Sequence, residues 1–303
     1  MVDVWALFLM LLKLLSYSAV VSGIGAVLLF TLLPLRSTFD QYGSNRFQFW
    51  LNRWLINWSA AGMILALLQL PLQAGAMAES GPAAMMDTIM LNIVWQSAIG
   101  SQTVIRFSGF AALLFAALLW SGWGKDTIVA WIVAWILAFS GIVSLAGSFI
   151  LTGHTAPLAG WVQAILLLHV LAIAAWVGAL WPLKKSCDLM AISSLLTLME
   201  RFGRVAVVIV IVLLSCGLLL LLQLIGSLNA LFTTDYGRLM LFKLMLVSCM
   251  LLLAAWHKFK LVKDLARHHN SDTLRRSIMV ETLLAVLVLT TTTVFTTVVG
   301  PAG

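Results

Sequence analysis

Eight long apolar segments, separated by short polar loops, dominate this sequence and limit what it can fold into. A helix needs about 20 consecutive apolar residues to cross the hydrocarbon core of a bilayer. Of all residues, 62% are hydrophobic and only 10% are charged. We place the predicted spans at residues 4–34, 48–71, 101–121, 127–150, 160–183, 205–226, 237–257 and 278–299. The sequence therefore predicts an all-α, polytopic membrane helix bundle that forms a single integral membrane domain over residues 1–303.

One further apolar stretch, residues 85–100, is interrupted by Asp87, Asn92 and Gln96. Polar side chains are expensive to place in the middle of a bilayer. We therefore expect this stretch to lie at the membrane interface before the third span, and not to cross the membrane itself.

The formal net charge of +7 could indicate a nucleic-acid partner, but the distribution of the charge favours another reading. Cytoplasmic loops of membrane proteins carry an excess of Lys and Arg. Here the basic residues gather in the odd-numbered loops, above all in two of them: Lys184, Lys185, Arg201 and Arg204 in loop five, and Lys258, Lys260, Lys263, Arg267, Arg275 and Arg276 in loop seven. The odd loops are thus predicted to be cytoplasmic and both termini external. No nucleic-acid partner is expected.

Two histidines frame the start of the fifth span. His154 precedes the span at its external boundary, and His169 lies about ten residues inside it. With a rise of about 1.5 Å per residue, His169 reaches roughly 15 Å below the outer surface. An ionisable side chain at that depth marks a functional site by default, with a hydrogen bond between helices as the alternative. Because their depths differ, we interpret the two histidines as successive stations for one ligand.

Sulfur-containing side chains are predicted at a similar depth. By the same helical rise, Met245 and Cys249 of the seventh span lie roughly 12 and 18 Å from the outer surface. Other sulfur groups of the outer half are Met10, Met63, Cys216 and Met240. Imidazole, thioether and thiol ligands together favour Cu(I) over a hard cation. His154, His169, Met245 and Cys249 are therefore our candidate copper ligands, although methionine is also a common filler of apolar cores.

Several motifs follow one another in the second half of the chain. His154 directly follows Gly153, and His169 is the second residue of LHVLAIAAWVGAL. RFGRVA begins at Arg201, DYGRLMLFKLML at Asp235 and LRRSIMVETLLAVLVL at Leu274. Their order and spacing resemble the copper resistance protein D (CopD) family over a core of about residues 90–300, whereas the first two spans match in hydropathy and in Gly23 and Gly25. The resemblance implies a bacterial inner-membrane protein of copper transport and homeostasis with a periplasmic copper-binding partner. It also implies His154 and His169 as ligands.

Two other functions stay open at this level. Histidines on neighbouring helices can ligate haem b and make the bundle an electron-transfer protein. His169 has no obvious histidine partner at its depth, but His169 and Met245 could together ligate a haem. The chain could instead be a non-transporting dock for a periplasmic copper chaperone. The sequence contains no GxSxG, HExxH or Walker motif, so no enzyme activity is expected. Whether the chain forms a homo-oligomer is left open.

Charged residues inside or near the spans include Lys13, Arg106, Lys243 and Glu281. The long side chains of Lys13 and Lys243 can extend toward the outer surface. Glu281 lies about one turn inside the last span, where it could pair with an arginine of loop five or seven, and we interpret it as a structural residue and not as part of a proton relay. His257 stands at the edge of the cationic loop seven, where solvent exposure is expected.

Overall fold

The computed structural model describes residues 4–33, 41–78, 82–122, 127–152, 159–224, 229–268 and 270–297. Within these residues, all regular structure is helical, and eight helices are long and apolar enough to cross a membrane. The long helices are α1 (Val4–Leu32), α2 (Gln41–Ala78), α4 (Ala98–Ser121), α5 (Ile128–Gly147), α6 (Gly160–Leu189), α7 (Ile192–Leu224), α9 (Asp235–Trp256) and α11 (Asp272–Thr297). The predicted bundle of eight spanning helices is confirmed.

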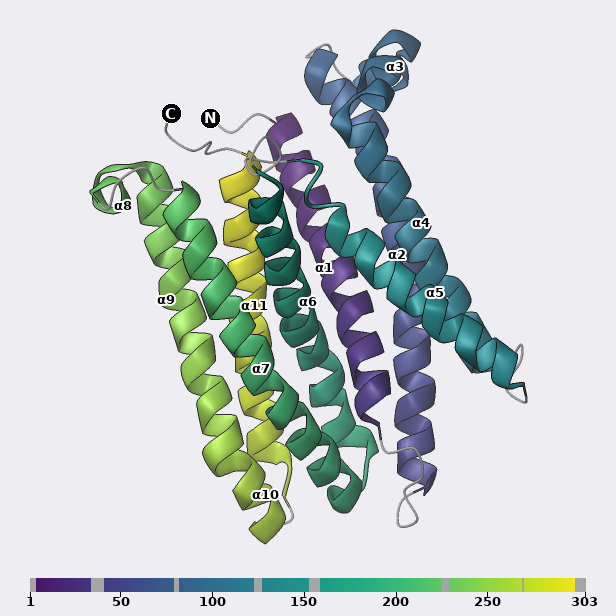
Figure 1. Ribbon diagram of the computed structural model, residues 1–303, viewed down its shortest axis with the longest axis vertical. Helices are drawn as coiled ribbons and strands as arrows, with labels where there is room; N and C mark the ends of the chain where they lie inside the picture. Colours follow the sequence, from purple (N-terminus) through teal and green to yellow (C-terminus); the bar gives the residue numbers. More distant parts are fainter. Residues whose placement is uncertain are drawn as a thin grey trace.

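Five short helical segments connect or extend the long helices. They are the 3₁₀-helix η1 (Pro82–Met86), α3 (Thr88–Gln96), α8 (Ala230–Thr233), the π-helix η2 (His257–Leu261) and α10 (Val262–His268). Helix α3 lies within the stretch that was predicted to stay out of the spans, at one end of the bundle (Figure 1). Asp87 starts it, because its carboxylate accepts hydrogen bonds from the backbone N–H groups of Ile89 and Met90 at 2.8 and 3.2 Å.

Some helices extend well beyond the predicted apolar spans. Helix α7 begins at Ile192, whereas its apolar run begins near residue 205. The added turns carry Glu200, Arg201 and Arg204, and both residue types have good helix propensity. Hydropathy marks the part of a helix that crosses the hydrocarbon and says little about turns that continue into the interface.

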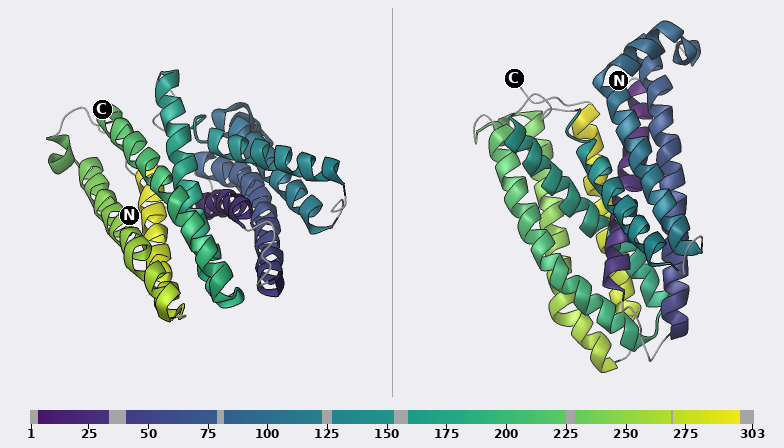
Figure 2. Two further views of the ribbon diagram at one scale, coloured as in Figure 1. Left: turned by 60° about the horizontal axis from the view of Figure 1, so that its bottom comes forward. Right: turned by 45° about the vertical axis from the view of Figure 1, so that its right-hand side comes forward.

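Two groups of helices flank a central pair (Figures 1 and 2). Helices α2, α4 and α5 pack on one side, helices α7, α9 and α11 on the other, and α1 and α6 lie between them. Helix α1 starts and α11 finishes at the same end of the bundle, which we call the termini end (Figure 1). At the opposite end α6 finishes, α7 starts and α10 lies, and we call it the basic end because loops five and seven are there.

The central pair is held together by two glycines. A Cβ atom on Gly25 of α1 would overlap the backbone of Gly178 on α6, and a Cβ atom on Gly178 would overlap the backbone of Val21. Small residues at such crossings allow the two backbones to touch, and this is a major source of helix association in membranes. The α1–α6 crossing therefore fixes how the two helix groups meet.

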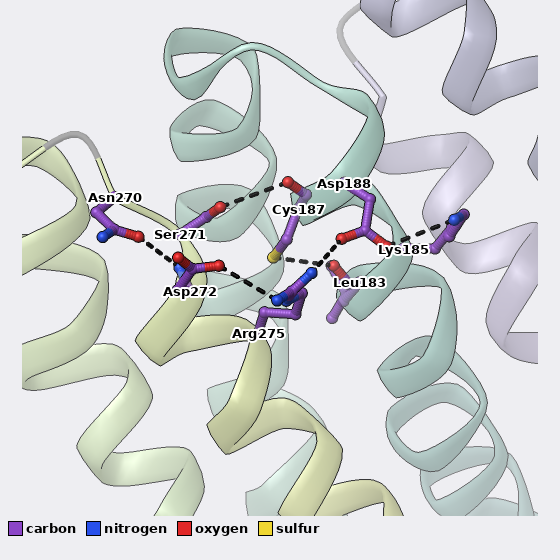
Figure 3. Close-up of polar contacts among 8 residues, drawn as sticks. All are labelled: Leu183, Lys185, Cys187, Asp188, Asn270, Ser271, Asp272 and Arg275. Carbon is purple, nitrogen blue, oxygen red and sulfur yellow. Dashed lines mark hydrogen bonds and ion pairs between the residues drawn. The ribbon is translucent and has the colours of Figure 1, made fainter.

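At the basic end, polar contacts fasten the start of α11 to the end of α6 (Figure 3). Arg275 donates to Asp188 at 3.1 Å and also pairs with Asp272 at 3.3 Å. Ser271 donates from its hydroxyl to the backbone carbonyl of Cys187 at 3.4 Å. We call this set of contacts the clasp.

The partner of Glu281 differs from the prediction. Glu281 pairs with His257, with 3.1 Å between Oε2 and Nδ1, and not with an arginine of loop five or seven. The reason is that α9 continues as a π-helix, which keeps His257 against α11, while Arg275 is used by the clasp. The expectation that His257 is solvent-exposed was therefore wrong, because only 14% of its side chain is accessible.

Candidate functional site

His169 lies on α6 with its ring against α7. A Cβ atom built on Gly217 of α7 would come within 3.2 Å of His169 Cε1 and 3.6 Å of Nδ1. The ring also lies near the backbone carbonyl of Leu213, one turn before Gly217 on α7, but forms no hydrogen bond of regular geometry through Nδ1. Because Gly217 has no side chain, the imidazole can lie directly on the α7 backbone.

The Nδ1 atom of His169 is buried and has no hydrogen-bond partner within the described part of the chain. A buried polar atom left unpaired is destabilising by about 1–3 kcal/mol. Such atoms are rare in folded proteins and call for an explanation, of which an absent ion is one. The nitrogen is thus free to act as a ligand.

A buried thiol directly precedes this glycine on α7. Cys216 directly precedes Gly217, is 7% exposed, and shares its face with the buried residues Leu213 and Leu220. Residues three and four apart lie on one side of a helix. The sequence counts Cys216 only among several sulfur groups of the outer half, and the signal that would have singled it out is its place beside a glycine facing His169.

A lysine completes the surroundings of the imidazole. Lys243 of α9 is near enough to His169 to act on it electrostatically. Its ammonium group opposes binding of a divalent cation by neutral ligands. A thiolate bound to Cu(I), by contrast, carries no net charge.

Met245 and Cys249, the predicted sulfur ligands of the seventh span, lie on the outer surface of α9. Met245 is 54% exposed and Cys249 is also exposed. At about 100° per residue, Met245 is turned by about 200° from Lys243, which is the residue that acts on His169. The structure thus places both side chains away from the imidazole, and their role as ligands stays a prediction.

The remaining predicted ligand, His154, falls outside the described residues. Within those residues, no group of three or more His, Cys, Asp or Glu side chains could hold a metal ion.

Two further cations lie in the half of the bundle nearer the termini. Arg106 of α4 is 4% exposed; its Nε donates to Ser148 at 3.0 Å, and its guanidinium stacks 4.9 Å from the Phe149 ring centre. Lys13 donates to the backbone carbonyl of Thr296 at 3.1 Å and to the hydroxyl of Thr297 at 3.0 Å, so it caps the end of α11. In the described chain neither cation has a carboxylate partner.

Comparison with known families assigns the chain. The family model for the copper resistance protein D-like N-terminal domain matches residues 1–164, and the model for copper resistance protein D matches residues 196–295. The chain belongs to the copper resistance protein D family. The N-terminal match extends the family assignment to the first two spans, where the sequence alone resembled the family only in hydropathy and in Gly23 and Gly25.

A curated relative of the family is copper transport protein CutJ of Bacillus subtilis (strain 168). It is 29% identical to this chain over 257 residues, which are 82% of this chain and 46% of the relative. The chain thus spans about half the length of that protein. No solved structure matches it.

Proposed function

We propose that this copper resistance protein D family member transports copper across the bacterial inner membrane. Copper binds in the half of the bundle nearer the termini and passes toward the basic end. Membership of the family and the likeness to a copper transport protein support the metal. The observation that carries the site is the buried, unpaired Nδ1 of His169 beside Gly217 of α7, which the buried Cys216 directly precedes.

The proposed ligands are His169 Nδ1 and the Cys216 sulfur. Thiolate and imidazole form a soft ligand set, which selects Cu(I) among the metals of the cell. The charge of a bound Cu(I) is cancelled by the thiolate, so the loaded site places no net charge in the low-dielectric bundle. A site with few ligands also lets the ion leave again, which transport requires.

The orientation of the bundle, on which the proposed direction of copper transport rests, is inferred from the charge of the basic end. Because loops rich in Lys and Arg stay in the cytoplasm, we assign the basic end to the cytoplasm and the termini end to the periplasm. Copper then enters at the end where η1 and α3 lie, delivered by a periplasmic copper-binding protein. It reaches His169 before it moves toward the cytoplasm.

The experiment is anaerobic Cu(I) loading of the detergent-purified protein, followed by measurement of metal content and visible absorption. The wild type is expected to retain copper stoichiometrically, and His169→Ala and Cys216→Ala are expected to lose it. Met245→Leu and Cys249→Ser test the two ligands predicted from the sequence, and both are expected to retain copper because these side chains are exposed on α9. Copper retained equally by His169→Ala would overturn the proposed site.

The same measurement separates the other functions. A Soret band that disappears in His169→Ala would show that the protein binds haem b and that His169 is an axial ligand of its iron. Absence of both copper and haem from the wild type would favour the dock for a periplasmic copper chaperone, in which the bundle itself holds no metal.

A further inference from the structure

A second polar cluster lies toward the basic end, where α9 passes into the π-helix η2. His257 bonds to two residues of α11 that are one turn apart. Its Nε2 is 2.7 Å from the hydroxyl of Ser277, and its Nδ1 is 3.1 Å from Oε2 of Glu281. Single turns of π-helix inside longer helices are frequent at functional sites.

The order serine, histidine, carboxylate is also that of a nucleophilic triad, but the surroundings do not support acyl transfer. Ser277 lies five residues after the start of α11, inside a regular helix whose backbone N–H groups are engaged in helical hydrogen bonds. An oxyanion hole needs free, preorganised donors beside the nucleophile. We therefore look to the histidine and the carboxylate for the role of the cluster.

Glu281 is the most deeply buried carboxylate described, with 1% of its side chain exposed. Its second oxygen, Oε1, is buried and has no hydrogen-bond partner in the described chain. A buried carboxylate that keeps its charge needs compensation for each of its oxygens. One histidine on Oε2 leaves that compensation incomplete.

The helices packed against α11 add almost no other ionisable group at this depth. Helix α1 has none from Ser18 to Leu32, and α6 has none from Val170 to Leu183. Helix α9 has only the exposed Cys249 between Leu244 and Trp256. Glu281 and His257 thus face each other in otherwise apolar surroundings.

The charged groups nearer the membrane surface are turned elsewhere. On η2, Lys258 and Lys260 are exposed and lie over the rings of Phe259 and Trp256 at 6.0 and 5.5 Å. On α11, Arg276 is exposed and Arg275 belongs to the clasp (Figure 3). None of them is bonded to the free oxygen of Glu281 within the described structure.

We propose that the His257–Glu281 pair is a proton-binding site that couples copper movement to a proton. With neutral histidine and ionised glutamate the pair carries one buried negative charge, and one proton from the cytoplasm makes it neutral overall. A net charge is costly in this buried position, where Oε1 of Glu281 has no hydrogen-bond partner in the described chain, and a proton on the pair removes it. The coupling to copper rests on the proposed transport function, whereas the proton site itself does not.

Ser277 suits such a site because a hydroxyl both donates and accepts hydrogen bonds. It can donate to Nε2 when the neutral imidazole carries its proton on Nδ1, and accept from Nε2–H when the proton is on Nε2. The imidazole can therefore donate to an ionised Glu281 or accept from a protonated one without moving. Ser277 is a positioning residue in this arrangement.

The proton site is tested by infrared spectroscopy of the protein in lipid vesicles across a pH series. The expected result is a carbonyl stretch from one buried protonated carboxylic acid that titrates reversibly, is absent in Glu281→Gln and shifts its pH midpoint in Ser277→Ala. Glu200→Gln, which alters an exposed carboxylate at the basic end, is the matched control and should leave the band unchanged. A band pattern identical in Glu281→Gln and wild type would overturn the proposal.

The coupling is tested by anaerobic Cu(I) uptake into proteoliposomes with and without an imposed pH gradient. The wild type and Glu200→Gln should change their uptake rate with the gradient, and Glu281→Gln should not. Wild-type uptake that ignores the gradient would refute the coupling. The infrared band could belong to Glu281 while the wild type moves no copper. That result would refute the proposed transport function and support the proton site.

Discussion

Gly217 determines how closely the imidazole of His169 can approach the backbone of α7. The imidazole lies on the α7 backbone only because position 217 has no side chain, and its Nδ1 faces that gap without a partner. The sequence shows an intramembrane histidine, and depth alone marks it as unusual. It could not show which neighbouring helix the ring meets, because that depends on the rotation of α6 and α7 about their axes.

Filling the gap should displace the ring. A Cβ atom at position 217 would stand 3.2 Å from His169 Cε1, so Gly217→Ala requires a shift of a few tenths of an ångström and Gly217→Val a larger one. We expect Gly217→Ala to bind Cu(I) nearly as the wild type does, and Gly217→Val to bind it at least about tenfold more weakly, since small displacements around a metal ligand have effects of that size. Competition with a Cu(I) chelator measures both. Equal affinities of Gly217→Val and wild type would refute the contact with α7 as the site.

Arg106 shows what a buried charge without an acid partner does to stability. Its guanidinium is held by Ser148 and Phe149 and meets no described carboxylate. Replacing buried ions by apolar side chains of similar size is often stabilising. We therefore expect Arg106→Met to raise the free energy of unfolding by roughly 1–2 kcal/mol. Arg275→Met, which breaks the clasp, should lower it.

Tryptophan fluorescence during unfolding in detergent measures both Arg106→Met and Arg275→Met. If Arg106→Met unfolds more easily than the wild type, the hydrogen bond to Ser148 and the stacking on Phe149 stabilise the protein by more than the burial of the Arg106 charge destabilises it. Stabilisation together with loss of copper transport would indicate that the arginine is kept for function.

At the scale of helices, apolar length and loop charge sufficed to predict eight spans and the separate position of α3. They did not predict where α2 and α7 begin, because helical turns at the interface leave no hydropathy signal. They also missed the π-helix after α9. Its five residues contain no glycine or proline that would mark a change of helix geometry in the sequence.

The α1–α6 crossing is the element most sensitive to added volume. A methyl group on Gly178 would overlap the α1 backbone, which cannot yield as a side chain can. We expect Gly178→Ala to destabilise the bundle by roughly 2 kcal/mol, within the range typical of overpacking. Gly203→Ala is the control, because nothing lies within 4 Å of a Cβ atom there. Thermal unfolding of the two variants should differ clearly, and equal stability would contradict the close crossing.

For the whole molecule, the side of the membrane on which each end lies stays a prediction from loop charge. Met86→Cys places a thiol at the termini end on a side chain that is 75% exposed, and Glu200→Cys places one at the basic end. A membrane-impermeant maleimide applied to intact cells should label Met86→Cys above the wild-type background and leave Glu200→Cys unlabelled until the cells are opened. The opposite pattern would reverse the orientation of the bundle.

The sequence contains the family, the number of spans and the metal class, because these depend on composition and on motifs with a fixed order. The sequence does not show which side of each helix packs against its neighbours. Met245, Cys249 and Cys216 are equally plausible sulfur ligands when only depth is known. The rotation of α9 turns the first two outward, and the rotation of α7 turns the third inward.

The central claim is that copper crosses this bundle through His169, and uptake into proteoliposomes tests it most directly. Purified wild type, His169→Ala and the control Cys249→Ser are reconstituted, given Cu(I) anaerobically from outside, and the copper inside is counted over time. The account predicts uptake by the wild type and by Cys249→Ser, and a rate near that of empty vesicles for His169→Ala. Uptake by His169→Ala at the wild-type rate would contradict it.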